Sequence, residues 1–291
     1  MMNTERKWIV GCAAVQLLTT LLLFIYLKDA YPGVNMTTPS EMINKYKPDT
    51  SLQSLFRISW AYLFVGKFLT LYYLYGLAKK RTIFSTKLYI IWILTMVNMV
   101  LWMLAYGFEA FNHALLTMVV MAGLCFVHVY EVTKRYVDSE MNYKTSSDPL
   151  PETSTWMFRH LVVYPNVFSA WWGIESIAFS LVYFLAPLSE QSIGEKTISG
   201  TSSLVFFGIC QILWVMADFS YFKKYTRHIW CVYVFMVYIA GGILAINYES
   251  SIGFTTNNYV CVGECLFALS ALFFRYQSNQ SLLHRPEAKL K

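Results

Sequence analysis

The sequence predicts an all-α, polytopic transmembrane helical bundle of about eight helices, and three observations support this fold class. The chain of 291 residues is 56% hydrophobic and only 14% charged, well below the roughly 25% charge of a typical soluble domain. Its apolar residues fall in blocks of about twenty, the length that crosses a hydrocarbon core about 30 Å thick. Its basic residues lie mainly between these blocks, as topology signals do.

The predicted spans form a single transmembrane domain over residues 1–291. They cover residues 8–27, 53–77, 88–107, 112–132, 158–185, 201–221, 229–247 and 257–276. The first block follows Arg6 and Lys7 and has no small-x-small cleavage site, so we expect a retained signal-anchor rather than a secretory signal. The connector 133–157 contains Pro149 and Pro151, and we expect it to be a flexible loop on the inside.

Eight crossings with the amino terminus inside divide the basic residues unevenly. Seventeen Lys and Arg residues fall in the inside segments and five in the outside segments, with Lys67 left within a helix. The positive-inside rule therefore supports the number of spans together with an orientation that keeps both termini cytoplasmic. This orientation places the sequon at Asn35 in the first outside loop, where glycosylation can occur.

Several kinds of chemistry have no signature in the sequence. All six cysteines lie inside apolar blocks and no Cys-x-x-Cys pair has a His partner, so neither a disulfide framework nor a metal site is indicated. The usual motifs for phosphate, zinc and acyl chemistry are absent. We therefore expect no catalytic residue, no cofactor and no enzyme activity. The expected partners are membrane lipid and a small apolar ligand rather than nucleic acid, and self-association stays open.

The polar residues at membrane depth are candidates for function, because a charge there costs several kcal/mol unless it is paired or hydrated. Lys67, Glu175 and Glu264 are the candidate buried charges, with Asp218 nearer a helix end. Because Lys67 and Glu175 lie at comparable depth, an ion pair that lines a central cavity is one expectation. A pair that only fixes helix packing is the alternative. We expect His128, near the inside end of its span, to reach the interface.

Tryptophans well inside the predicted spans form a second group of candidates. Trp60, Trp102 and Trp172 belong to this group, and Asn98 lies one turn before Trp102. Indole rings that face a bundle interior can stack on a planar apolar ligand, and their N–H groups can orient it. Ordinary core packing is the alternative role for each ring.

Four stretches of the chain share a pattern of spacing with a known family. They are Met36-Thr-Thr-Pro-Ser-Glu-Met-Ile-Asn-Lys-Tyr46, Arg57-Ile-Ser-Trp60, Asn98-Met-Val-Leu-Trp102 with Tyr106-Gly-Phe-Glu109, and Tyr164-Pro-Asn-Val-Phe-Ser-Ala-Trp-Trp-Gly173. In these stretches the chain resembles the TspO/MBR-related family of tryptophan-rich sensory proteins, in a longer multi-helix form. It departs from the family pattern at Tyr106, where the family has tryptophan.

The resemblance implies a helical bundle that binds a planar apolar compound, such as a tetrapyrrole or a sterol, and acts as a sensor or carrier. The ligand-binding residues that it implies are Trp60, Asn98, Trp102, Glu109 and Trp172. Two other functions stay open. One is a proton- or ion-coupled transporter or channel that uses Lys67, Glu175 and Glu264. The other is a receptor or a structural membrane subunit.

Overall fold

The computed structural model describes residues 4–27, 36–38, 41–42, 45, 53–79, 84–143, 156–189, 196–226, 229–248 and 253–283. The helices are α1 (Thr4–Leu27), α3 (Gln53–Leu77), α4 (Thr86–Gly107), α5 (Phe111–Tyr143), the π-helical turn η1 (Arg159–Val163), α7 (Tyr164–Ser189), α8 (Lys196–Phe219), α9 (Lys223–Thr226), α10 (Cys231–Asn247) and α11 (Thr256–Leu283). No β-strand occurs among these described residues, so the predicted all-α class is confirmed.

Six helical segments are long and apolar enough to cross a membrane. They are Thr4–Tyr26, Thr86–Gly107, Phe111–Val137, Trp156–Leu185, Gly200–Phe219 and Thr256–Asn279. Their outer faces carry large apolar side chains that no other helix covers, among them Leu18, Phe24 and Leu213, each more than half exposed. Lipid solvates such surfaces, whereas water does not. The six helices therefore indicate an integral membrane protein.

Two further helices, α3 and α10, complete the predicted set of eight. α10 has 17 residues and is apolar throughout residues Cys231–Ala245, but at about 25 Å it is at the short end of the range for a spanning helix. α3 has 25 residues and carries Lys67 within it. The count of eight spans therefore stays a prediction.

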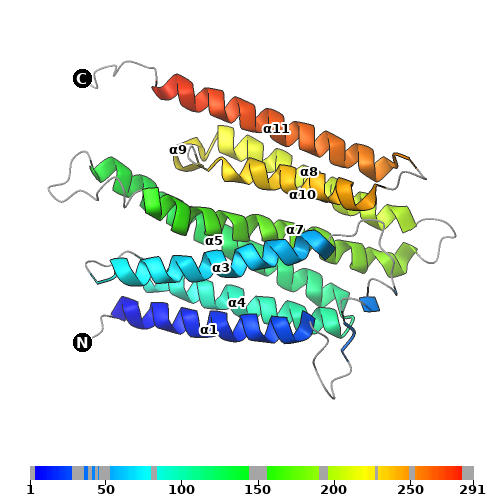
Figure 1. Ribbon diagram of the computed structural model, residues 1–291, viewed down its shortest axis with the longest axis horizontal. Coiled ribbons are helices and arrows are strands. Elements are labelled where there is room, and N and C mark those ends of the chain that lie inside the picture. The colour runs from blue at the N-terminus through cyan, green and yellow to red at the C-terminus, as the bar shows by residue number, and fades with distance from the viewer. Residues whose placement is uncertain are drawn as a thin grey trace.

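The helices form two rings that share α7. The first ring closes through contacts of α1, α3, α7, α5 and α4 in that order, and the second through α7, α8, α11 and α10. In Figure 1, α1 and α4 lie at one edge of the bundle and α11 lies at the other, with α7 between them. In an apolar 18-residue stretch of the α7 span, 78% of the residues are buried, against 28% to 44% in the corresponding stretches of the other five. We refer below to the five-helix ring and the four-helix ring.

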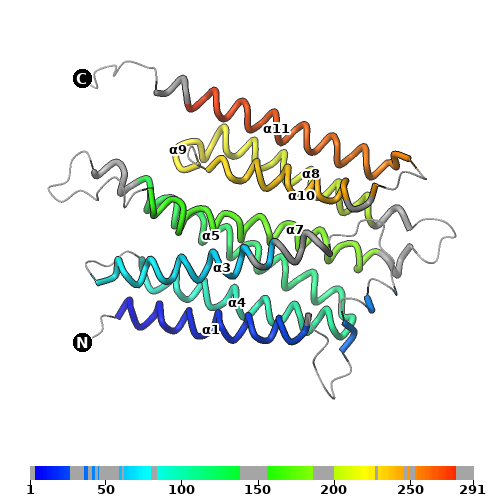
Figure 2. The backbone as a smooth tube through the Cα atoms, in the orientation of Figure 1, coloured from blue at the N-terminus to red at the C-terminus, as the bar shows by residue number. Residues whose placement is uncertain are grey.

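The two ends of the helical bundle can be followed in the chain trace. Figure 2 shows α1, in blue, beginning at the same end of the bundle at which α11, in red, finishes. An even number of antiparallel crossings produces this arrangement.

The contact between α5 and α7 is unusually close because Gly173 has no side chain. A Cβ atom at Gly173 would lie 3.1 Å from both Cα and Cβ of Ala122. Small residues at such crossings let two helix backbones approach, which is the main way in which helices gain packing energy inside a membrane. Gly173 therefore fixes the spacing between α7 and α5 within the five-helix ring.

The predicted inside loop is shorter than expected. We placed its start at residue 133, but α5 continues as a helix to Tyr143. Hydropathy marks where a helix leaves the membrane rather than where it ends, and the polar residues that follow, such as Glu131, Lys134 and Arg135, are good helix formers. Residues 144–155, with both prolines, lie outside the described residues.

Candidate functional site

Three tryptophans from three helices meet inside the five-helix ring. Trp60 of α3 and Trp102 of α4 stack with their ring centroids 6.0 Å apart and their planes 30° apart. Trp172 of α7 meets Trp60 edge-on, with centroids 4.9 Å apart. All three side chains are buried, with exposed fractions of 4% or less. The structure thus brings together three of the residues that the resemblance implies for ligand binding.

Further aromatic rings extend this group. The ring centroid of Tyr106 lies 5.5 Å from that of Trp102, 5.7 Å from that of Phe179 and 5.2 Å from that of Tyr183. We call Trp60, Trp102, Tyr106, Trp172, Phe179 and Tyr183 the aromatic cluster. The indole N–H of Trp102 donates to Ser180 Oγ at 3.2 Å. The cluster therefore combines flat apolar faces with hydrogen-bonding groups, the combination that small-molecule sites use.

The two polar residues implied by the resemblance make other contacts. Asn98 is half-buried, and its Nδ2 donates to the carbonyl oxygen of Leu94 in its own helix at 2.9 Å. Glu109 lies at the turn between α4 and α5 with a positive φ of 57°. Its Oε1 accepts from Thr37 Oγ1 at 2.8 Å, and its Oε2 pairs with Lys45 Nζ at 2.5 Å. Glu109 therefore anchors the segment before α3 to this turn, a role that the sequence did not suggest.

Lys67 also lies inside the five-helix ring. Its ammonium group donates to Asn166 Oδ1 at 2.7 Å and lies 4.2 Å from the ring centroid of Trp92. Asn166 and Glu175 are nine positions apart on α7, which puts their side chains on opposite faces of that helix. Lys67 and Glu175 therefore face different rings, and the ion pair expected between them is not formed.

His128 does not reach the interface. Its side chain is 5% exposed and its ring lies 5.5 Å from the ring of Trp92 in an edge-on contact. The prediction was wrong because the position of a residue near a helix end gives its depth but not the face of the helix from which it projects.

Glu175 and Glu264, the two carboxylates predicted to be buried charges, belong to the four-helix ring. Glu175 is 1% exposed and lines a cavity of about 10 Å³ together with Leu204, Phe207 and Ile239. Glu264 is 7% exposed, and its Oε1 lies 3.1 Å from where a Cβ of Gly208 would be. Within the described part of the chain, neither carboxylate has a hydrogen-bond partner, and no group of three or more His, Cys, Asp or Glu side chains could hold a metal ion.

A buried ion pair in the four-helix ring was missed from the sequence. Arg275 of α11 donates through Nη2 to Asp218 Oδ1 of α8 and, at 3.1 Å, to Thr226 Oγ1. The hydroxyl of Tyr233 donates to the second oxygen of Asp218. The side chains of Arg275 and Asp218 are 1% and 0% exposed.

A signal for Arg275 does exist in the sequence. We counted Arg275 only as a basic residue of an inside segment. It follows Asn257 by 18 positions and Glu264 by 11, spacings that place all three on one face of a helix. A polar face on an otherwise apolar spanning helix predicts contact with other polar groups.

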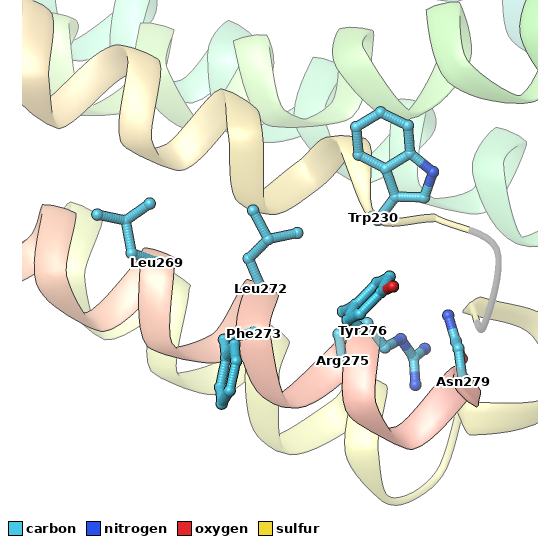
Figure 3. Close-up of a pocket in the computed structure, with 7 residues that line it drawn as sticks. All are labelled: Trp230, Leu269, Leu272, Phe273, Arg275, Tyr276 and Asn279. Carbon is cyan, nitrogen blue, oxygen red and sulfur yellow. The ribbon is translucent and has the colours of Figure 1, made fainter. Parts of the chain in front are cut away.

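A groove of about 560 Å³ opens beside this ion pair, between α10 and α11. Its lining residues are Trp230, Leu269, Leu272, Phe273, Arg275, Tyr276 and Asn279. Figure 3 shows Arg275 at one end of the groove, beside Tyr276 and Asn279, with Trp230 opposite, just before the first residue of α10. The groove therefore connects the surface of the bundle with the region of the buried Arg275.

No protein-family model, no curated protein and no solved structure matches the chain. The resemblance to the TspO/MBR-related family therefore stays a prediction. The function has to be argued from the geometry of the two rings.

Proposed function

We propose that the chain crosses its membrane eight times with both termini cytoplasmic, and that it binds a planar apolar ligand as a TspO-like sensor or carrier. The observation that supports this function is the meeting of Trp60, Trp102 and Trp172 inside the five-helix ring. Each tryptophan comes from a different helix. A ligand between them would therefore contact three walls of the ring, as expected for a tetrapyrrole or a sterol.

The proposed topology adds α3 and α10 to the six apolar helices. Both run between helices of the six and contact α7, so they share its environment. The first helix begins and the last helix finishes at one end of the bundle (Figure 1), which agrees with an even number of crossings. The excess of basic residues in the inside segments orients that end toward the cytoplasm. Asn35, which lies outside the described residues, would then face the compartment in which glycosylation occurs.

Ligand entry requires only a small separation of two helices. A planar ligand sandwiched between two rings needs about 7 Å between their planes, because each face-to-face contact is about 3.5 Å. The centroids of Trp60 and Trp102 are 6.0 Å apart, a distance that includes any lateral offset of the two rings. A displacement of α3 from α4 by roughly 1–4 Å would therefore be needed to admit the ligand. The indole N–H of Trp102, now bonded to Ser180, would then be available to a polar group at the ligand edge.

Replacing Trp102 by leucine should weaken ligand binding about tenfold. One aromatic contact contributes about 0.5–1.5 kcal/mol beyond its buried area, and 1.4 kcal/mol corresponds to a factor of ten in Kd. The measurement is a titration of the full chain in lipid nanodiscs with a porphyrin, followed by the absorbance of the porphyrin and by quenching of tryptophan fluorescence. Binding to the unmodified chain should be saturable.

Trp171→Leu is the matched control for this titration. Trp171 is as buried as Trp172 beside it, but its ring faces Phe207 and Trp214 of α8. We expect Trp171→Leu to keep the Kd of the unmodified chain. Equal losses of affinity in Trp102→Leu and Trp171→Leu, or an unchanged Kd in Trp102→Leu, would contradict a site in the aromatic cluster.

A further inference from the structure

The interior of the four-helix ring contains polar side chains at successive levels along α8. At the first level, Thr201 Oγ1 donates to Asn257 Oδ1 of α11 at 2.6 Å. At the last level, Asp218 pairs with Arg275 of α11. The partners are 56 positions apart in the first contact and 57 in the second. α8 and α11 therefore run parallel and keep one register along their whole contact.

Three more polar side chains lie between these two levels. Glu175 of α7 lines a cavity together with Leu204 and Phe207 of α8. Glu264 of α11 contacts α8 at Gly208. Gln211 of α8 follows one turn later, and its exposed fraction is 0%. The order along α8 is thus a hydroxyl, two carboxyl groups, an amide and an ion pair.

These levels extend over most of the thickness of a membrane. Thr201 and Asp218 are separated by about 26 Å along α8, at 1.5 Å per residue, and a hydrocarbon core is about 30 Å thick. The largest distance along α8 between successive polar levels, from Gln211 to Asp218, is about 10 Å. Within that step lies the indole N–H of Trp214, which is buried.

The polar groups in the middle of this series lack hydrogen-bond partners among the described residues. Within the described part of the chain, both carboxylate oxygens of Glu175 and of Glu264, and both polar atoms of the Gln211 amide, have no hydrogen-bond partner. An ionised carboxylate at this depth is costly unless a cation or a proton neutralises it. Such groups in spanning helices commonly mark the paths of ions or protons.

The space available favours a proton. The cavity at Glu175 is about 10 Å³, which is room for about one water molecule. At Glu264, a single methyl group on Gly208 would already press against the carboxylate, so a hydrated ion does not fit on that side. Titratable groups that interact electrostatically with these carboxylates are Tyr238 of α10 for Glu175, and Cys261 and Cys265 of α11 for Glu264.

The level of the Asp218–Arg275 pair lies beside a groove that opens at the surface of the bundle. The groove of about 560 Å³ between α10 and α11 is lined by Arg275, Tyr276 and Asn279 at one end (Figure 3). Arg275 is bonded to Asp218 and Thr226. Its guanidinium group therefore separates the polar interior of the four-helix ring from this groove. Movement of that side chain would connect Gln211 and Asp218 with water at the mouth of the groove.

We propose that the interior of the four-helix ring is a proton pathway, with the carboxyl groups of Glu175 and Glu264 as its proton-binding groups and the Asp218–Arg275 pair as its gate. A proton from the aqueous side near Thr201 binds a carboxylate oxygen and neutralises it. It then moves along water held by Gln211 and leaves past Asp218. Each passage regenerates the carboxylate and carries one positive charge across the membrane. The pathway is independent of ligand binding in the five-helix ring.

Proton flux into liposomes tests this proposal. The full chain is reconstituted with a pH-sensitive dye inside, and a potassium gradient with valinomycin drives proton entry. We expect flux at least tenfold above protein-free liposomes, and a loss of at least tenfold in Glu264→Gln and in Glu175→Gln. Glu5→Gln is the matched control, since Glu5 is a buried carboxylate of the five-helix ring that accepts from Phe84 N and the Tyr89 hydroxyl. It should keep the flux of the unmodified chain.

A second pair of variants covers the case in which a glutamine variant does not fold. Gly208→Ala presses on the Glu264 carboxylate and should slow the flux several-fold. Gly241→Ala, whose new methyl group would make an ordinary 3.7 Å contact with Cys265, should not. Three results would each overturn the proposal: flux equal to that of protein-free liposomes, flux unaffected in folded Glu264→Gln, or carboxyl-dependent flux of sodium in place of protons.

Discussion

Replacing Asp218 by leucine should lower the free energy of unfolding by about 3 to 5 kcal/mol. The change leaves the guanidinium group of Arg275 buried without its counter-charge, and removing one partner of a buried ion pair has a cost of this size. Thr226 would remain a hydrogen-bond acceptor for Arg275, but a neutral hydroxyl cannot compensate the charge. The measurement is unfolding of the purified chain in mixed micelles with increasing SDS, followed by circular dichroism.

Another ion pair among the described residues provides a matched control for this experiment. Lys45 and Glu109 are 53% and 27% exposed, and exposed pairs contribute about 0–1 kcal/mol. Glu109→Leu should therefore cost about 1 kcal/mol or less. The double variant Asp218→Leu with Arg275→Met should regain much of the stability that Asp218→Leu alone loses, because no charge is then left buried. Equal losses in Asp218→Leu and Glu109→Leu would show that the Asp218–Arg275 pair is not buried.

Replacing Gly173 by leucine should destabilise the chain by about 3 kcal/mol, at the upper end of the range for overpacking. The atoms that the new side chain would meet belong to the backbone and Cβ of Ala122 on α5, and they cannot rotate away. α5 and α7 would have to separate. Because α7 belongs to both rings, we expect the same variant to weaken porphyrin binding and proton flux together. Unfolding in SDS measures the loss.

The control for Gly173→Leu is the same substitution at Gly123. Gly123 lies next to Ala122 on α5, and a Cβ there would meet nothing within 4 Å. Leucine at this exposed helix position should leave stability unchanged or raise it slightly, because leucine favours helix more than glycine does. A loss in Gly123→Leu as large as in Gly173→Leu would rule out close packing at Gly173 as the cause.

The helical class followed from the sequence for a simple reason. Lipid offers the backbone no hydrogen bonds, so apolar blocks of this length have to satisfy their N–H and C=O groups within a helix. The ends of the helices were less predictable. α5 extends to Tyr143 and α11 to Leu283. In α5, charged helix formers such as Lys134 and Arg135 continue the helix beyond the apolar block.

The candidate sites show which contacts between side chains cannot be predicted from positions along the sequence. Trp60, Trp102 and Trp172 were proposed together from a resemblance, and the structure brings them together. Lys67 and Glu175 were paired on depth alone, and the rotation of α7 separates them. Asn166, the actual partner of Lys67, has no charge to mark it. A correct pairing requires the face of each helix as well as its depth, and the face depends on packing between helices.

The same reasoning explains why the Asp218–Arg275 pair was missed. In the sequence, Arg275 reads as one of many basic residues at the cytoplasmic end of a span. Its burial depends on α8 placing Asp218 at the matching level, and on Tyr233 of α10 bonding the same carboxylate. Three separate helices meet at this point, so no single stretch of sequence contains the site.

The most direct test of the central claim, eight crossings with both ends inside, is a map of glycosylation acceptor sites introduced one at a time. The account predicts that acceptors in 28–52, which includes the natural Asn35, in 190–195 and in 249–252 are modified. Acceptors in 80–83, in 144–155, in 227–228 and at both termini should stay unmodified. Modification in 80–83 would remove α3 from the spans, and a lack of modification in 249–252 would remove α10. A sugar on either terminus would contradict the orientation itself.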